Sequence, residues 1–217
     1  KVPFSVVEAY KNLRVHLLAH FEACNGKVVA ISSPNASEGK TTTAINTAIT
    51  LAQLEKKILL IDTDSRRPAV HRKLKMTNEI GCLEVISGKA SLEDAVKSYI
   101  PYLDVLTVGS TTSAAEFFAS AAFDELLIKL RDEYDYIVID TPPVNLVSDA
   151  LVVSQKCDGL MLVVRNNVTK YSAFNEAITD IKKLNINFFG AVMNGVGGKG
   201  SSNYQYRHGY NQYYGSK

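Results

Sequence analysis

The order of apolar runs along the chain predicts an α/β fold, a mostly parallel sheet with helices on both faces. Short β-rich runs alternate with stretches of helical period, as where the run at 28–31 is followed by a helical pattern over 42–54. Polar or acidic turns follow the first two runs and a later one at 136–139. The chain has 217 residues, 46% of them hydrophobic, which suits one such domain with a full core.

The periodicity of the apolar residues and the residues that start and stop helices predict the elements in chain order. We expect helices at 5–22, 42–54, 115–131 and 171–184, with mixed short helices over 69–98. We expect strands at 28–31, 57–61, 103–108, 136–139, 159–164 and 188–193. The residues of the third long helix expected to face the core are Phe118, Ala122, Leu126 and Leu130. Asp149 follows a loop, and we expect it to cap the N-terminus of a helix.

Charge and cysteine usage narrow the class of protein. The formal net charge is +2, which is too small to argue for a nucleic-acid partner. The longest apolar runs, such as 159–164, are far shorter than a membrane span, and no signal peptide is recognisable. Cys24, Cys82 and Cys157 lie apart in apolar contexts, without the spacing of a metal site. We therefore expect reduced thiols in a cytoplasmic protein.

A phosphate-binding loop is predicted after the strand at 28–31. The turn there ends in Gly39-Lys40-Thr41 and leads into a helix, the context in which such a loop is credible. Lys40 adds positive charge for the β- and γ-phosphates, and the Thr41 hydroxyl can bind Mg²⁺. Pro34 stands where the pattern usually has its first glycine, and the alternative is a turn with a surface lysine. The residues expected to hold the phosphates at the helix N-terminus are Ser37, Glu38, Gly39, Lys40, Thr41 and Thr42.

Three carboxylates are predicted to join this loop. Asp62 and Asp64 follow the second predicted strand, and Asp140 follows a later one. Because parallel strands all end at one edge of a sheet, these side chains should converge there. Asp140, Thr41 and Asp62 are the predicted Mg²⁺ ligands. At least one of Asp62 and Asp64 is expected to accept a proton from a nucleophile that attacks the γ-phosphate, and the sequence leaves the choice open.

The end of the last predicted strand and the segment beyond it differ from the rest of the chain. Asn194 closes that strand, and its amide can read an adenine edge. Residues 197–217 hold no aliphatic residue and no carboxylate side chain, so they cannot build a core and are predicted to be a disordered tail. About 20 extended residues reach on the order of 60 Å, enough to bring a phenol to a γ-phosphate. Five of the chain's 11 tyrosines lie in this tail: Tyr204, Tyr206, Tyr210, Tyr213 and Tyr214. The alternative is a low-complexity solubilising tail.

Together these motifs resemble those of the bacterial tyrosine kinases of capsule and exopolysaccharide synthesis, the BY-kinases, and above all the stand-alone cytoplasmic kinases of Gram-positive bacteria. Residues 34–41 are similar to the family's Walker A motif, 58–68 to its Walker A′ motif and 136–143 to its Walker B motif. The tyrosine tail resembles its autophosphorylated cluster. The Walker A′ motif with the tail is specific, whereas Gly-Lys-Thr alone is not. Family members commonly have glycine where Ser37 stands.

The resemblance implies a P-loop NTPase-like kinase that uses ATP and Mg²⁺. It implies catalytic roles for Lys40, Asp62 and Asp64, phosphorylation of the tail tyrosines in trans, other protein tyrosine substrates, and regulation of capsular or exopolysaccharide synthesis and export. It also implies a homo-oligomeric ring, of which an octamer is one size, and which phosphorylation breaks up. The other implied partners are a transmembrane adaptor of the polysaccharide co-polymerase type, which would hold the kinase at the inner face of the plasma membrane, and a cognate phosphotyrosine phosphatase.

The resemblance also divides the chain. Residues 1–25 would form an oligomerisation helix, 26–196 the kinase domain and 197–217 the tail. The family's Glu-x-x-Arg-x-x-Arg oligomerisation motif falls on Glu8, Lys11 and Arg14. Lysine at position 11 keeps the charge but loses the bidentate fork of arginine, so we expect weaker ring assembly. A solvated charged face is the alternative for these three residues.

Two other functions fit part of the pattern. The first is a MinD/ParA-like partitioning or positioning ATPase on the same fold. Such proteins carry a second lysine four residues before the second glycine of the loop, where this chain has Asn35, and they lack a tyrosine-rich tail. The second is a nucleotide-regulated scaffold without catalysis, which would require the loss of a catalytic residue.

Overall fold

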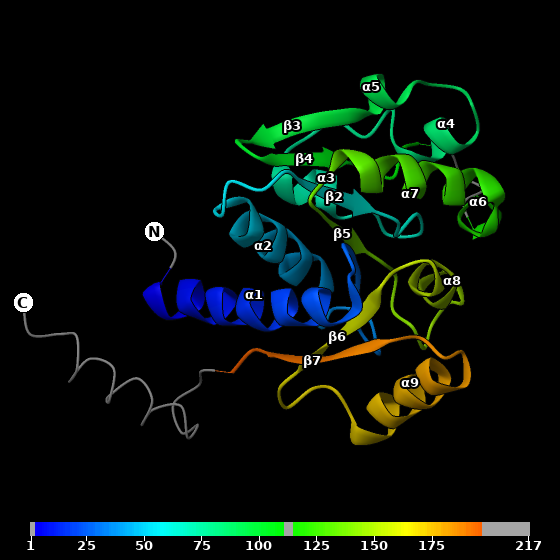
Figure 1. Cartoon of the computed structure of the whole chain (residues 1–217). Helices are drawn as coiled ribbons and strands as arrows, with labels where there is room; N and C mark the ends of the chain where they lie inside the picture. The colour runs from blue at the N-terminus through cyan, green and yellow to red at the C-terminus, as the bar shows by residue number, and fades with distance from the viewer. Residues whose placement is uncertain (1–2, 111–114, 197–217) are drawn as a thin grey trace, which may run out of the picture.

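The computed structural model describes residues 3–110 and 115–196, and they form a seven-stranded sheet with helices on both faces (Figure 1). The strand order is β3-β4-β2-β5-β1-β6-β7, and every neighbouring pair is parallel except β3 with β4. The strands are β1 Val28–Ser32, β2 Ile58–Asp62, β3 Val96–Ile100, β4 Leu103–Leu106, β5 Tyr136–Asp140, β6 Gly159–Arg165 and β7 Phe188–Asn194. The predicted α/β class is therefore confirmed.

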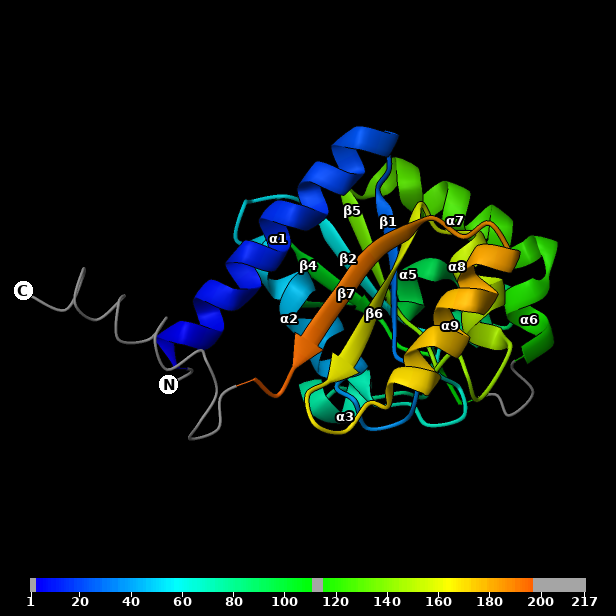
Figure 2. The same ribbon diagram turned by 90° about the horizontal axis from the view of Figure 1, so that it is seen from below.

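The helices lie on the two faces of this sheet. The first face carries α1 Phe4–Cys24, α2 Lys40–Ala52 and α3 Val70–Leu74. The other carries α4 Cys82–Ile86, α5 Leu92–Ala95, α6 Ala115–Ala119, α7 Ala121–Glu133, α8 Asp149–Gln155 and α9 Tyr171–Lys183. Figures 1 and 2 show α1 and α2 together on one side and α7, α8 and α9 on the other.

The central strand β1 explains why the sequence forms a two-faced layer structure. All five of its residues are buried, and alternate side chains enter opposite cores, with Val29 facing α1 and α2 and Ala30 facing α8 and α9. Ten of the 13 residues of α2 are buried, because this helix lies between the sheet and α1. The helix that follows the phosphate loop is thus enclosed rather than exposed on a surface.

Two predictions about local structure were wrong. Residues 96–98, expected to belong to the short helices of 69–98, instead lie in the antiparallel edge strand β3, whose side chains are half-buried or exposed. The helix predicted at 115–131 is two helices, because Ser120 is extended at φ −76° and ψ 156° and starts α7 anew. The new helical phase leaves Ala122 exposed and buries Phe123 instead, while Phe118, Leu126 and Leu130 face the core as expected.

Two further expectations concern membrane crossing and the tail. No helix in the described ranges combines the length and apolar character needed to span a membrane. The predicted phosphoacceptors Tyr204, Tyr206, Tyr210, Tyr213 and Tyr214 lie outside the described residues.

Candidate active site

The phosphate loop occupies residues 33–39, between β1 and α2, at the carboxyl edge of the sheet. Gly39 has φ +108°, and a Cβ built there would lie 2.1 Å from the Asn194 Nδ2 atom, so only glycine fits. Ser37 has φ +65°, a left-handed conformation that glycine adopts more easily. Helix α2 begins at Lys40, so its first amides face the loop.

Lys40 is the meeting point of the loop with two of the carboxylates. Its Nζ atom lies 2.7 Å from Asp64 Oδ2 and 3.8 Å from Asp140 Oδ1. Burial would lower the pKa of Lys40, but the charges of Asp140 and Asp64 outweigh burial and hold that pKa above its usual value. The lysine is therefore a buried cation, aimed at the point where the strands end.

Asp62 and Asp140 end neighbouring strands in register, so their backbones pair directly across β2 and β5. Both side chains are fully buried. Burial, and secondly the charge of Asp140, raise the pKa of Asp62 to about 7. Burial raises the pKa of Asp140 to about 6, against the opposing pull of Lys40. Two adjacent carboxyls that resist ionisation mark a place where a cation or a proton is accommodated.

The three carboxylates differ in how their oxygens are used. Asp62 accepts hydrogen bonds from the backbone N–H groups of Asp64, Ala69 and Val70 at 3.0–3.2 Å, which fixes the loop that enters α3. Asp64 accepts from Lys40 and from the Arg67 N–H. Among the described residues neither Asp140 oxygen has a hydrogen-bond partner of good geometry, but Lys40 Nζ lies 3.8 Å from Oδ1 and the Thr41 hydroxyl helps to lower the pKa of this carboxyl. A buried carboxylate short of hydrogen bonds is costly unless a nearby cation compensates its charge.

The donor set fits a magnesium ion bound together with nucleotide phosphates. Thr41 is buried at the start of α2 and offers a hydroxyl, and the buried oxygens of Asp140 offer the carboxylate. Within the described residues no group of three or more His, Cys, Asp or Glu side chains could hold a metal alone. A P-loop magnesium takes much of its coordination from phosphates and water, so such a group is not needed.

Several residues at the site were not predicted from sequence. Arg66 donates through Nε to Asp149 Oδ2 at 3.2 Å, which links the loop after β2 to α8. Asp149 is the first residue of α8 and makes no cap, so the N-cap expectation was wrong. Arg165 donates to the Ser37 carbonyl at 3.1 Å, and Thr169 donates to Glu38 Oε1 at 2.7 Å. These contacts join residues more than 80 positions apart in the chain, so no local sequence pattern predicts them.

Asn194 reaches the site, as expected from its place at the end of β7. Its Nδ2 atom donates to the Glu38 carbonyl at 3.0 Å, and its Oδ1 atom accepts from the Gly195 N–H at 2.8 Å. The side chain thus holds the phosphate loop, and its reading of an adenine edge stays a prediction.

The predicted oligomerisation residues lie on α1, apart from the carboxylates. Lys11 pairs with Glu8 at 2.7 Å on one helix face. Arg14 donates to the carbonyl of Thr50 in α2 at 2.7 Å. Their role between subunits stays a prediction.

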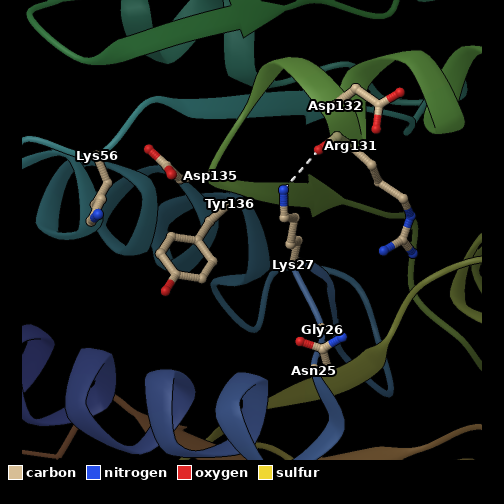
Figure 3. Close-up of a pocket in the computed structure, with 8 residues that line it drawn as sticks. All are labelled: Asn25, Gly26, Lys27, Lys56, Arg131, Asp132, Asp135 and Tyr136. Atoms are coloured by element: carbon tan, nitrogen blue, oxygen red, sulfur yellow. Dashed lines mark hydrogen bonds between the residues drawn. The ribbon is translucent and has the colours of Figure 1, made fainter.

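A polar pocket of about 420 Å³ lies at the opposite edge of the sheet, where β1 and β5 begin (Figure 3). Gly26 and Lys27 are among the residues that line it, and the Lys27 Nζ atom donates to the Arg131 carbonyl at 2.9 Å. None of the predicted site residues lines it, so it is separate from the nucleotide site.

Comparisons with known proteins agree with this geometry. A family model described as an AAA domain matches residues 26–187. Tyrosine-protein kinase YwqD of Bacillus subtilis (strain 168) is 36% identical over 190 residues, covering 87% of this chain and 80% of the relative. Tyrosine-protein kinase CpsD of Streptococcus agalactiae is 32% identical over 192 residues, covering 87% of this chain and 83% of the relative.

Solved structures match as well. The kinase domain of Escherichia coli tyrosine kinase ETK superposes with a TM-score of 0.85 at 30% identity, covering 90% of this chain and 78% of that chain. The septum site-determining protein MinD complexed with Mg-ADP, from Pyrococcus horikoshii OT3, matches with a TM-score of 0.66 at 23% identity, covering 79% of this chain and 71% of that chain. That second likeness shows the shared nucleotide-binding fold alone. The relatives, the kinase-domain superposition and the converging motifs show that the chain belongs to the bacterial tyrosine-protein kinases, the BY-kinase family.

Proposed function

We propose that this protein transfers the γ-phosphoryl group of ATP to tyrosine hydroxyls, and that the tail tyrosines at 204–214 of another copy are among its acceptors. One observation carries the proposal. Lys40, Asp62, Asp64 and Asp140 meet at the carboxyl edge of the sheet, next to a loop whose Gly39 has no room for a side chain. Such a constellation suits phosphoryl transfer, in which positioning and charge stabilisation supply most of the rate.

Each residue has a distinct part in the transfer. Lys40 would exchange its bond to Asp64 for contacts with the β- and γ-phosphates. The tyrosine oxygen attacks the γ-phosphorus, the bond to the β–γ bridging oxygen breaks, and ADP leaves with that electron pair. A carboxylate takes the phenolic proton, which matters because an unperturbed tyrosine pKa is near 10. Asp62 and Asp64 are the two candidates for this base.

Magnesium would be held by Thr41 and Asp140, with Asp62 beside them, and would neutralise charge on the phosphates. The burial of Asp140 and its lack of a hydrogen bond of good geometry to any described residue support this assignment. Asp62 already accepts three backbone hydrogen bonds that hold the loop before α3, so fewer of its acceptor sites are left for the ion than in Asp140.

The wider setting is proposed from family membership. We place the kinase in the cytoplasm, at the membrane through a transmembrane adaptor of the polysaccharide co-polymerase type. We propose a ring of copies joined through Glu8, Lys11 and Arg14, with tails acting in trans and phosphorylation dissolving the ring by repulsion between crowded dianions. A cognate phosphatase would reverse the modification. Control of capsular or exopolysaccharide synthesis and export would be the outcome.

The test separates this kinase from a partitioning ATPase. Purified protein is incubated with ATP and Mg²⁺, and phosphotyrosine and free phosphate are measured together. We expect phosphotyrosine to accumulate. Free phosphate without phosphotyrosine would favour the ATPase instead. The sequence already favours the kinase, because Asn35 stands where those ATPases carry their second lysine. Asn35 instead stays within the phosphate loop, where its N–H donates to Glu38 Oε2 at 2.8 Å.

A further inference from the structure

Residues at the ends of β6 and β7 and in the connection between β6 and α9 hold the phosphate loop through hydrogen bonds. Arg165 at the end of β6, Thr169 before α9 and Asn194 at the end of β7 each bond to residue 37 or 38 of the loop. We call these three residues the loop clamp. Local sequence did not predict the contacts of Arg165 and Thr169, and neither residue belongs to the three Walker motifs.

Of the three clamp residues, Thr169 alone contacts the Glu38 side chain, whereas Asn194 binds the Glu38 backbone carbonyl and Arg165 binds the Ser37 carbonyl. Glu38 is 1% exposed, although it stands directly before the glycine and lysine that receive polyanionic phosphates. A buried carboxylate there would repel the nucleotide unless its charge were satisfied elsewhere. Its Oε2 atom accepts from the Asn35 N–H at 2.8 Å, and its Oε1 atom accepts from the Thr169 hydroxyl at 2.7 Å. Thr169 in turn accepts from the Arg165 N–H at 2.7 Å.

The loop needs such an anchor because its backbone is strained. Ser37 at φ +65° and Gly39 at φ +108° flank Glu38, and a non-glycine residue in this region costs on the order of 1 kcal/mol. A strained conformation persists only when its surroundings over-determine it. Contacts on Ser37 and Glu38 supply that constraint from outside the loop.

We infer that Thr169 is a positioning residue for nucleotide binding: through its hydroxyl it holds Glu38, and through Glu38 it keeps the loop amides arranged for phosphates. The inference rests on the proposed function only in that the loop binds nucleotide. Thr169 touches no reacting group, so loss of its hydroxyl should weaken nucleotide affinity and raise the KM for ATP more than it lowers kcat.

The experiment compares three variants of the whole chain. Thr169→Val keeps the shape and removes the hydroxyl, Thr169→Ser restores the hydroxyl, and Thr179→Val is the matched control. Thr179 is exposed on α9, and its hydroxyl bonds only within that helix, to the Asn175 carbonyl. The readouts are the Kd of a fluorescent ADP analogue, KM and kcat in the phosphotyrosine assay, and the thermal midpoint.

We expect Thr169→Val to weaken ADP affinity about 5- to 20-fold, as for part of a hydrogen bond to a charged group. Thr169→Ser should stay within about twofold of wild type, and Thr179→Val should not change affinity. The inference is overturned if Thr169→Val lowers the thermal midpoint but leaves the Kd unchanged, or if Thr169→Ser fails to restore affinity. The ADP measurement needs no kinase activity, so it stands even if the phosphotyrosine assay finds none.

Discussion

The amino group of Lys40 and the carboxylate of Asp64 form a buried ion pair at 2.7 Å, although 24 residues separate them in the chain. The pair means that the phosphate-binding cation is already committed to a partner before nucleotide arrives. Binding therefore exchanges one anion for another. The lysine charge is already desolvated, so nucleotide binding does not have to meet that part of the cost, which amounts to several kcal/mol.

Replacement of Lys40 by methionine should abolish phosphotyrosine formation, because the phosphates lose their buried cation. The same change leaves three buried carboxylates without their counter-charge, and we expect a stability loss on the order of 3–5 kcal/mol at neutral pH. Circular dichroism with urea denaturation measures the second effect, and an anti-phosphotyrosine blot the first. Normal labelling would refute the role of Lys40. Labelling of this variant by an active copy would support transfer in trans.

Replacement of the five tail tyrosines together by phenylalanine should remove most autophosphorylation and leave nucleotide binding unchanged. The acceptor hydroxyls are lost, while the phosphate loop is untouched. Mass spectrometry of ATP-treated protein locates the phosphate, and the fluorescent ADP analogue measures binding. Phosphate found mainly at Tyr10 or Tyr136 would contradict the assignment of the tail tyrosines as acceptors. Tyr136 is not expected to be an acceptor, because its ring is stacked on Phe21 of α1.

Gly39→Ala should weaken nucleotide binding severely, because the new Cβ would lie 2.1 Å from Asn194 Nδ2 and would also resist a φ of +108°. Gly190→Ala is the matched control, since Gly190 has φ +117° with no atom within 4 Å of a built Cβ. Both variants should lose about 1–2 kcal/mol of stability from backbone strain. Only Gly39→Ala should also lose ADP affinity, and equal affinities in the two variants would show that the contact with Asn194 is unimportant.

The carboxylate of Asp158 should make the free energy of unfolding depend on pH. Although burial opposes ionisation, the bonds from Arg131 and from the N–H groups of Lys27 and Val28 hold the pKa of Asp158 below its usual value. A depressed folded pKa contributes stability that is present above the unfolded value near 3.9 and is lost as pH falls through the folded value. Asp158→Asn should therefore cost about 2–4 kcal/mol at pH 7 and progressively less below pH 4.

Urea denaturation at several pH values measures this difference. Asp180→Asn is the control, because its ion pair with Lys183 is exposed and should contribute less than about 0.5 kcal/mol. A gap between wild type and Asp158→Asn that stays constant from pH 7 to pH 3 would contradict the prediction.

Arg14 should contribute both to the stability of the subunit and to the assembly of the oligomer. Its guanidinium binds the carbonyl of Thr50 in the last turn of α2, where helix carbonyls run out of backbone partners within the helix and take other donors. Arg14→Ala should lower the free energy of unfolding by about 1–2 kcal/mol, and it should also reduce the mass found by light scattering. Glu8→Gln breaks only a surface pair with Lys11, worth about 0.3 kcal/mol, so it should affect assembly alone. Unchanged mass in both variants would remove α1 from the interface.

Much of the site could be predicted because parallel strands deliver their ends to one edge. That rule predicts that Lys40, Asp64 and Asp140 converge, and the ion pairs of Lys40 with both carboxylates agree with it. The pairing partners of each strand were not predictable, yet this convergence does not depend on them.

The rest escaped prediction for identifiable reasons. Strand β3 carries Lys97-Ser98-Tyr99 at an exposed edge, so it lacks the apolar signal of a core strand. The break at Ser120 depends on one residue's backbone, which shifts the phase of the helix after it. Thr169 reads as an ordinary loop residue until the fold brings Glu38 to its hydroxyl.

The direct pairing of Asp62 with Asp140 across β2 and β5 limits how this chain can diverge. Exchange of one apolar residue for another within either strand leaves the two carboxylates opposite each other. Insertion or deletion of a single residue would move one of them by about 3.3 Å and turn it to the opposite face of the sheet. Natural variants should therefore differ in length in the connections between strands, while the spans 58–62 and 136–140 keep constant length even where their side chains change.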